Sequence, residues 1–221
     1  YQGIDQIKET GSFNLSGLRG VDLAGKTLGI IGTGRIGKKM IKIAKGFEMN
    51  VIAYDPFPDE KSAGELGYRY AGLDEVLAYS DIVTLHCPYT PQTHHMINAA
   101  NMNKFKKGAY LVNTARGGLV ETEALVSALK QGILAGAAMD VLEEEGETKD
   151  ELTLLTDGHP NEKELKTVLM NHALMKMPNV LITPHNAFNS QEALVRILDT
   201  TIENILSFKK GEALNSVPEL K

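Results

Sequence analysis

The stretch Thr27-Leu-Gly-Ile-Ile-Gly-Thr-Gly-Arg-Ile-Gly37 decides the fold. A short apolar run, typical of a buried strand, leads into Gly32, Gly34 and Gly37, and apolar residues at helical spacing follow as far as Phe47. In a strand-turn-helix that binds a dinucleotide, the first glycine permits the tight turn, the second lets the backbone approach a pyrophosphate, and the third lets the helix pack closely on the strand. The helix N-terminus adds N–H groups and a positive dipole end, so this stretch predicts a phosphate cradle.

An acidic residue ends the next predicted strand. Asp55 follows Gly37 by 18 residues, where a carboxylate accepts hydrogen bonds from the adenosine ribose hydroxyls of a bound dinucleotide. A carboxylate there repels a 2′-phosphate, which favours NAD over NADP, although Lys38 and Lys39 weaken this preference. The alternative is a glycine-rich turn in which Asp55 only caps a helix. The order of strand, turn, helix and acid favours the dinucleotide site.

The rest of the chain repeats the alternation of short apolar runs and helical segments. This pattern predicts an α/β fold, a Rossmann-type doubly wound parallel sheet with helices on both faces. Nearly continuous apolar strands imply burial on both faces of the sheet. Gly46 and Gly132 are placed to end two of the helices. The predicted strands are residues 27–31, 50–54, 82–86, 109–113, 134–140 and 180–183.

Segments outside this repeat predict the domain organisation. Residues 1–20 have the character of a linker, and residues 21–190 form the nucleotide-binding domain. This domain contains a polar insertion at residues 146–178, with one helix predicted at residues 161–174. Residues 191–221 form a C-terminal helix and tail whose apolar stripe needs a partner surface.

Composition excludes several function classes. The chain of 221 residues has 23 Lys and Arg against 28 Asp and Glu, a net charge of -5 with no long block of either sign, which argues against nucleic acid or an anionic membrane as partner. No apolar run reaches the roughly 18 residues that span a bilayer. The one cysteine, Cys87, cannot form an internal disulfide. We therefore expect a soluble cytoplasmic protein.

Residues with catalytic chemistry follow three predicted strands. Arg116 follows the strand at 109–113, Asp140 ends the next strand, and His185 follows the last. Active sites in parallel sheets lie outside the carboxyl ends of the strands, so we expect these residues to converge. Arg116 can hold a substrate carboxylate through its planar guanidinium, and His185 can exchange a proton with a carbonyl oxygen. Together they favour hydride transfer involving a small 2-oxo acid.

Each of these residues also has an ordinary structural interpretation. An arginine before two glycines is often only a turn, a Glu triplet such as residues 143–145 is usually a solvated helix start, and a histidine after proline is commonly a surface residue.

Further residues near these strand ends also have candidate roles. Glu145 can hold the imidazole of His185 protonated, and Asp140 lies within reach of the carboxamide end of the cofactor. The pair His94-His95 lacks further ligands, so we expect no metal site. Cys87 lacks a partner base, which argues against a catalytic thiol.

These motifs resemble the D-isomer-specific 2-hydroxyacid dehydrogenases, which include D-lactate, glycerate, phosphoglycerate and formate dehydrogenases. The resemblance spans nearly the whole chain. The sequence His185-Asn186-Ala187-Phe188 and the insertion after Glu145 are most similar to the D-lactate dehydrogenases. The motifs are Gly32-x-Gly34-x-x-Gly37 with Asp55, Leu85-His86-Cys87-Pro88 with Thr93, Asn113-Thr114-Ala115-Arg116-Gly117-Gly118, Ala138-Met139-Asp140-Val141 followed by Glu145, and Thr183-Pro184-His185.

The resemblance implies an NAD-dependent oxidoreductase that acts on the CH–OH group and interconverts a 2-oxo acid and a D-2-hydroxy acid. It implies Arg116 as the substrate-carboxylate residue, His185 as the acid/base and Glu145 as its partner. Spacing within the family selects Glu145 over Glu143 and Glu144, although the family often has a proline in this loop. The implied cofactor contacts are Gly32, Gly34, Arg35, Ile36, Gly37, Asp55, Cys87, Pro88, Thr93, Thr114, Ala115, Arg116 and Asp140.

Family members carry an N-terminal substrate-binding domain that this chain lacks. We therefore expect the nucleotide-binding half of a longer protein, in which residues 1–20 derive from the interdomain linker and residues 191–221 return to the absent domain. The resemblance also implies a homodimer. A non-catalytic NAD-sensing module of corepressor type, with the same Arg, Glu and His, remains an alternative. Other Rossmann enzymes, such as alanine dehydrogenases, predict different residues at positions 116 and 185.

Overall fold

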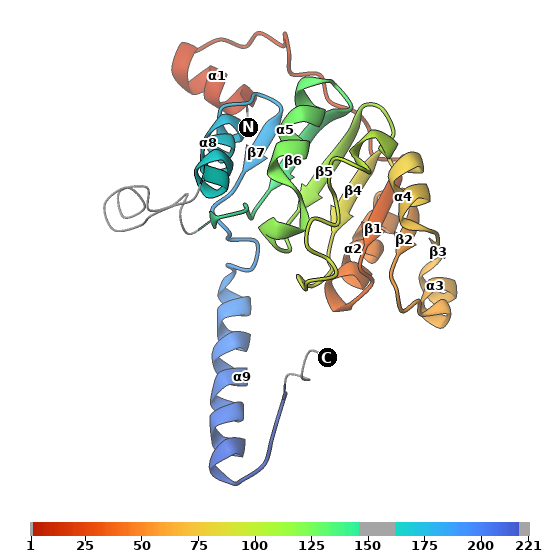
Figure 1. The fold of residues 1–221 in the computed structure, drawn as a ribbon, viewed down its shortest axis with the longest axis vertical. Coiled ribbons are helices and arrows are strands. Elements are labelled where there is room, and N and C mark those ends of the chain that lie inside the picture. The colour runs from red at the N-terminus through yellow and green to blue at the C-terminus, as the bar shows by residue number, and fades with distance from the viewer. Residues whose placement is uncertain (1, 146–161, 217–221) are drawn as a thin grey trace.

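The protein is represented by a computed structural model that describes residues 2–145 and 162–216. Seven parallel strands form one sheet in the order β3-β2-β1-β4-β5-β6-β7 (Figure 1). The sheet reverses its winding direction between β1 and β4, which confirms the predicted doubly wound Rossmann fold. The strands are β1 (Thr27–Ile31), β2 (Asn50–Tyr54), β3 (Arg69–Tyr70), β4 (Ile82–Leu85), β5 (Ala109–Asn113), β6 (Leu134–Met139) and β7 (Val180–Ile182).

Helices cover both faces of the sheet. Successive residues of β1 point to opposite faces, so Ile30 packs in one buried cluster with Ile41 of α2, and Ile31 packs in the other with Leu77 of α4 and Leu125 of α5. Such two-sided burial explains why the strands are almost wholly apolar. The helices are α1 (Gln2–Thr10), α2 (Arg35–Gly46), α3 (Glu60–Leu66), α4 (Leu73–Tyr79), α5 (Thr122–Lys130), α8 (Glu162–Met175) and α9 (Gln191–Lys209).

Three predicted strands extend one residue too far. His86, Asp140 and Thr183 each donate a backbone N–H to the neighbouring strand, at 2.7, 2.9 and 3.0 Å, but then turn out of the sheet. The two-residue strand β3 was not predicted, because it is too short for an alternation pattern. The chain therefore leaves the sheet at these three residues, of which Asp140 was predicted to contact the cofactor.

The N-terminal segment contains a helix that the sequence analysis did not predict. Within residues 1–20, expected to be a linker, α1 is followed by irregular chain, and the Gln6 side chain donates to the Asn14 carbonyl at 3.1 Å. Within the insertion, the helix expected at residues 161–174 is α8, shifted by one residue. The rest of the insertion that precedes α8, residues 146–161, lies outside the described residues.

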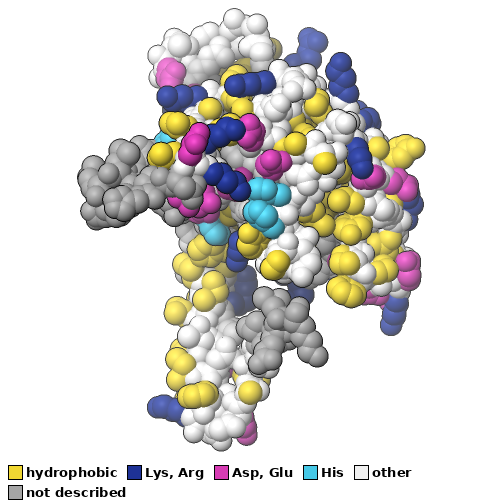
Figure 2. Space-filling view, viewed as in Figure 1, with side chains coloured by type: hydrophobic (Ala, Val, Ile, Leu, Met, Phe, Trp, Pro, Cys, Tyr) yellow, Lys and Arg dark blue, Asp and Glu magenta, His cyan; other side chains and the backbone are white. Residues whose placement is uncertain are grey.

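The C-terminal helix α9 projects away from the sheet (Figure 1). Ser190 is its N-cap and accepts a hydrogen bond from the Ala193 N–H at 3.2 Å. None of its residues is buried, and apolar side chains lie open along it (Figure 2). Across the described part of the chain, no helix combines the length and apolar character needed to cross a membrane.

Candidate active site

The turn between β1 and α2 is closed by contacts that only glycine permits. Gly32 has a φ of 96°, and a Cβ there would lie 2.6 Å from the backbone nitrogen of Cys87. A Cβ at Gly37 would overlap the carbonyl oxygen of Gly32. The two glycines therefore bring helix, turn and the segment after β4 into close backbone contact, as the cradle motif requires.

The N-terminus of α2 is free to receive an anion. Its N-cap, Gly34, has no side chain to satisfy the first N–H groups, and a Cβ at this position would meet nothing within 4 Å. Arg35 is exposed, and Ile36 is 67% exposed. Unsatisfied N–H groups at a positive dipole end fit a pyrophosphate, so the chain's own geometry fits the dinucleotide that its motif predicts.

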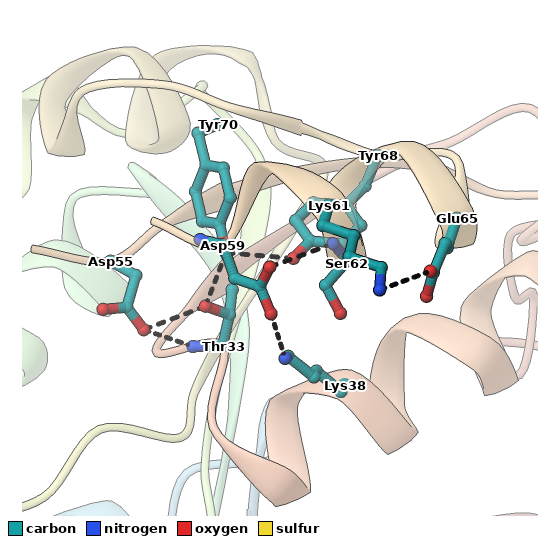
Figure 3. A network of polar contacts seen from close by, with 9 residues as sticks. All are labelled: Thr33, Lys38, Asp55, Asp59, Lys61, Ser62, Glu65, Tyr68 and Tyr70. Atoms are coloured by element: carbon teal, nitrogen blue, oxygen red, sulfur yellow. Dashed lines mark hydrogen bonds and ion pairs between the residues drawn. The ribbon is translucent and has the colours of Figure 1, made fainter. Parts of the chain in front are cut away.

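Asp55 lies beside this turn and is held by three hydrogen bonds, two of which come from Thr33 (Figure 3). Its Oδ2 accepts from the Thr33 N–H at 2.7 Å and the Thr33 hydroxyl at 2.9 Å, and its Oδ1 accepts from the Phe57 N–H at 2.9 Å. A carboxylate has about four acceptor positions, which leaves capacity for a ribose hydroxyl. The carboxylate is thus held beside the turn with acceptor capacity left, as the predicted bond to a ribose hydroxyl requires.

The segment after β4 forms a wall beside Gly32. Thr93 ties this segment together, because its hydroxyl donates to the Pro88 carbonyl at 2.8 Å and accepts from the Thr90 N–H at 2.8 Å. Burial raises the pKa of the Cys87 thiol to about 11, so the thiol stays protonated near neutral pH. Burial likewise lowers the pKa of His86, which keeps that imidazole neutral. Neither side chain has the character of a reacting group.

Arg116 lies on a turn at the end of β5. The buried Asn113 side chain shapes this turn, donating to the Arg116 carbonyl at 2.8 Å and accepting from the Ala115 N–H at 3.0 Å. Thr114 and Arg116 are exposed, and within residues 2–145 and 162–216 the guanidinium has no carboxylate partner. An exposed guanidinium of this kind is available to a carboxylate ligand.

Asp140 shapes the turn that carries the catalytic candidate His185. It is only 5% exposed, and its carboxylate accepts from the Thr183 hydroxyl at 2.5 Å, the Asn186 N–H at 3.0 Å and the Ala187 N–H at 2.9 Å. Burial by itself raises the pKa of Asp140, but these hydrogen bonds and the nearby His185 outweigh it and hold the pKa below its usual value. The sequence analysis assigned Asp140 to the cofactor and missed this second task.

His185 and Glu145 meet at the carboxyl end of β7. The His185 Nδ1 lies 3.1 Å from the Glu145 Oε1, and the two side chains are 37% and 23% exposed. His185 adopts a φ of 51°, which is uncommon outside glycine and is imposed by the turn around Asp140. With Nδ1 engaged by a carboxylate, Nε2 is the ring nitrogen left for proton exchange.

The neighbouring Glu143 points elsewhere, and this contact was missed from the sequence. Its carboxylate bonds the His95 Nε2 at 2.5 Å, and the N–H and hydroxyl of Thr122 at 2.7 and 2.6 Å. Its carbonyl accepts from the Asn171 side chain of α8 at 2.7 Å. Glu144, with a φ of 47°, lies between the two glutamates and lets them diverge. These contacts of Glu143 with His95, Thr122 and Asn171 form a brace that fixes the loop ending at Glu145.

Two adjacent histidines lie at the surface beside this brace. The His94 and His95 rings stack with centroids 3.8 Å apart, and the Tyr89 hydroxyl bonds the His94 Nδ1 at 3.0 Å. Figure 2 shows histidine side chains gathered in the middle of this face. No group of three or more His, Cys, Asp or Glu side chains among the residues described is arranged to hold a metal ion.

The fold and this site together define a dinucleotide-binding Rossmann domain. The family described as D-isomer specific 2-hydroxyacid dehydrogenase, NAD binding domain, matches residues 1–187. The chain belongs to this family, and NAD is its cofactor. The expected family and cofactor are thereby confirmed.

Relatives of known name support the same assignment. A 2-hydroxyacid dehydrogenase homolog of Zymomonas mobilis is 43% identical over 214 residues, which cover 96% of this chain and 62% of that protein. The D-lactate dehydrogenase of Escherichia coli is 40% identical over 201 residues, covering 91% of this chain and 58% of that protein. The structure of Aquifex aeolicus D-lactate dehydrogenase with NAD and lactic acid matches with a TM-score of 0.84 and 38% identity, covering 96% of this chain and 61% of that one. The chain therefore spans about three fifths of the length of such relatives.

Proposed function

We propose that this chain is the NAD-binding half of an oxidoreductase that interconverts a small 2-oxo acid and a D-2-hydroxy acid, with a D-lactate-like substrate. The observation that carries the proposal is the His185–Glu145 pair, 3.1 Å apart, at the edge of the sheet that also bears Arg116 and the NAD cradle. The names of the relatives, and the NAD and lactic acid bound to one of them, support it.

The proposed catalytic residues have separate tasks. Bound NADH supplies the hydride. Arg116 binds the substrate carboxylate through its planar guanidinium and orients the adjacent carbonyl. His185 gives its Nε2 proton to the carbonyl oxygen during reduction and takes it back during oxidation. Glu145 accepts from Nδ1–H, which fixes the tautomer and stabilises the imidazolium.

The proposed domain organisation follows the same reasoning. Residues 21–190 bind NAD, residues 1–20 link this domain to a substrate-binding domain, and residues 191–221 return to that domain. The exposed apolar side chains of α9 support this role, since Leu198 is 61% and Ile202 54% exposed. Closure of two domains would exclude water from the reacting groups.

We also propose a homodimer in the cytoplasm. The dimer rests on the family resemblance, and light scattering on the purified complete protein tests it. The location is supported by the single cysteine, Cys87, whose thiol stays reduced in that compartment. A fluorescent fusion followed by cell fractionation tests the location.

The decisive experiment measures NADH oxidation by the complete protein with pyruvate, glyoxylate, hydroxypyruvate and branched 2-oxo acids. Fast turnover on one of them, with a D-2-hydroxy acid as product, is the expected result. Tight NADH binding without turnover on any would contradict the enzyme and point to the NAD-sensing module. That alternative is not favoured, because the relatives are named as dehydrogenases. An inactive His185→Ala variant is the control for a contaminating reductase.

A further inference from the structure

An ion pair between Lys38 and Asp59 lies in the same network of polar contacts as Asp55 and Thr33 (Figure 3). Lys38, in the first turn of α2, places its Nζ 2.7 Å from the Oδ2 of Asp59. Asp59 is the N-cap of α3, and its Oδ1 accepts from the Ser62 N–H at 3.1 Å. The two side chains are 34% and 46% exposed, so both are accessible from solvent.

A chain of hydroxyl groups connects this pair to Asp55. The Asp55 carboxylate can only accept, so the Thr33 hydroxyl must donate to it. The Thr33 oxygen, 2.8 Å from the Tyr70 hydroxyl, therefore accepts from Tyr70. The Tyr70 oxygen in turn accepts from the Asp59 N–H at 3.0 Å and from the Tyr68 hydroxyl at 3.0 Å. Every proton in the chain is thus directed toward Asp55, and the same hydroxyl holds the backbone of Asp59.

The ammonium group of Lys38 is already engaged in the ion pair with Asp59. The hydrogen bond from Lys38 to Asp59 is the main cause of a raised pKa of Lys38 and of a lowered pKa of Asp59. Both groups are therefore ionised over the neutral range. A lysine ammonium on its flexible stem is an effective phosphate ligand when it is not otherwise engaged.

We propose that Asp59 is a second determinant of cofactor selectivity, because it holds Lys38 in an ion pair and so withholds the cation from a 2′-phosphate. Asp55 repels that phosphate directly, and Asp59 acts through Lys38, as a positioning residue. The inference rests on the NAD site proposed above. It explains how an NAD-binding domain can have a lysine close to the proposed ribose site without favouring NADP.

The test is the ratio of NADPH to NADH dissociation constants, measured by fluorescence titration without turnover. Asp59→Asn keeps a good N-cap and removes the charge, so NADPH binding is expected to tighten about three- to tenfold while NADH changes less than about twofold. Lys38→Met alone leaves the ratio near that of the parent protein, because Lys38 is already engaged. Adding Lys38→Met to Asp59→Asn abolishes the gain.

Two controls separate this proposal from a purely structural role. Asp74→Asn removes a similar surface pair, in which Asp74 lies 2.6 Å from the Nζ of Lys104, and leaves the cofactor ratio unchanged. Thermal unfolding of each variant reports any loss of the cap on α3. An unchanged ratio in Asp59→Asn, or a gain that survives without Lys38, overturns the proposal. Failure of the parent protein to bind NADH would instead overturn the cofactor site itself.

Discussion

Near each end of the sheet, a carboxylate that follows a strand is held by several hydrogen bonds, but the two carboxylates differ in their surroundings. Asp55 after β2 and Asp140 after β6 each accept three hydrogen bonds in the described structure. The donors to Asp55 come from 22 residues earlier or two residues later, whereas those to Asp140 come from 43 to 47 residues later. The first carboxylate is half-buried beside the cradle, and the second is buried under a turn. The local assembly at Asp55 therefore lies where we propose that the cofactor binds, whereas the long-range assembly at Asp140 positions the His185 side chain.

We propose that this contrast separates cofactor binding, at the end of the sheet near β2, from catalysis, at the end near β7. The cofactor end is one strand-turn-helix unit with the acid that follows it, so changes there should alter affinity for NADH. The catalytic end draws on the ends of β5, β6 and β7, with α8 inserted before β7. Changes there should alter kcat while NADH still binds. Substitutions matched between the two ends test this division.

The largest effect is expected at the catalytic end. His185→Ala removes the proposed proton donor and lowers kcat of the complete protein by about 10²- to 10⁴-fold, with little change in the dissociation constant of NADH. Steady-state kinetics and fluorescence titration measure the two quantities. Near-normal turnover would remove His185 from the acid/base role. Glu145→Gln should lower kcat by a smaller factor, again with NADH binding kept.

The cofactor end offers a matched pair of glycine substitutions. Gly37→Ala introduces a Cβ that overlaps the Gly32 carbonyl oxygen, so the free energy of unfolding should fall by about 1–3 kcal/mol and NADH binding should be lost. Gly34→Ala meets nothing within 4 Å, so stability should be kept while NADH binding still fails, because the added methyl occupies the place of the pyrophosphate. Calorimetry and titration separate the two outcomes. Equal loss of stability in both variants would contradict the open cradle.

A pH-dependent effect is expected at Asp140. Asp140→Asn should lower the free energy of unfolding by about 2 kcal/mol at pH 7, because three hydrogen-bond donors lose the buried, charged carboxylate that accepts from them. Since the folded pKa of Asp140 is lowered, its contribution is present above the unfolded value near 3.9 and is lost as pH falls through the folded pKa. Urea unfolding should thus show a gap between parent and variant that is constant above about pH 5 and narrows below about pH 4. A gap independent of pH would refute the role of the anion.

The smallest effect is expected at the brace. Glu143→Gln keeps the shape of the side chain but weakens its bonds to Thr122 and His95, so stability should fall by about 1 kcal/mol and kcat a few-fold. The control is Glu123→Gln, which removes an exposed ion pair with Lys166 and should change neither quantity measurably. A loss of NADH affinity without a loss of kcat would place Glu143 with the cofactor end instead.

Much of the fold and of the cradle could be predicted because their parts are close in sequence. The glycine spacing, the acid after the second strand and the apolar strands each reflect constraints between near neighbours. The divergence of Glu143 and Glu145 could not be predicted, since three consecutive glutamates have no distinguishing pattern and only the family spacing selected Glu145. His95 was considered only as a metal ligand, and its contact with Glu143, 48 residues further along the chain, was not predicted.

The sequence by itself determined the order of strands and helices, the dinucleotide cradle and the residue types available at each strand end. Only the tertiary structure decided which carboxylate each of those residues meets: Glu145 for His185, Glu143 for His95, and Asp59 for Lys38. The physical reason is that backbone periodicity and turn chemistry act over a few residues, whereas a hydrogen bond or ion pair needs two side chains within about 3 Å. Parallel strand order brings such distant residues to a common edge.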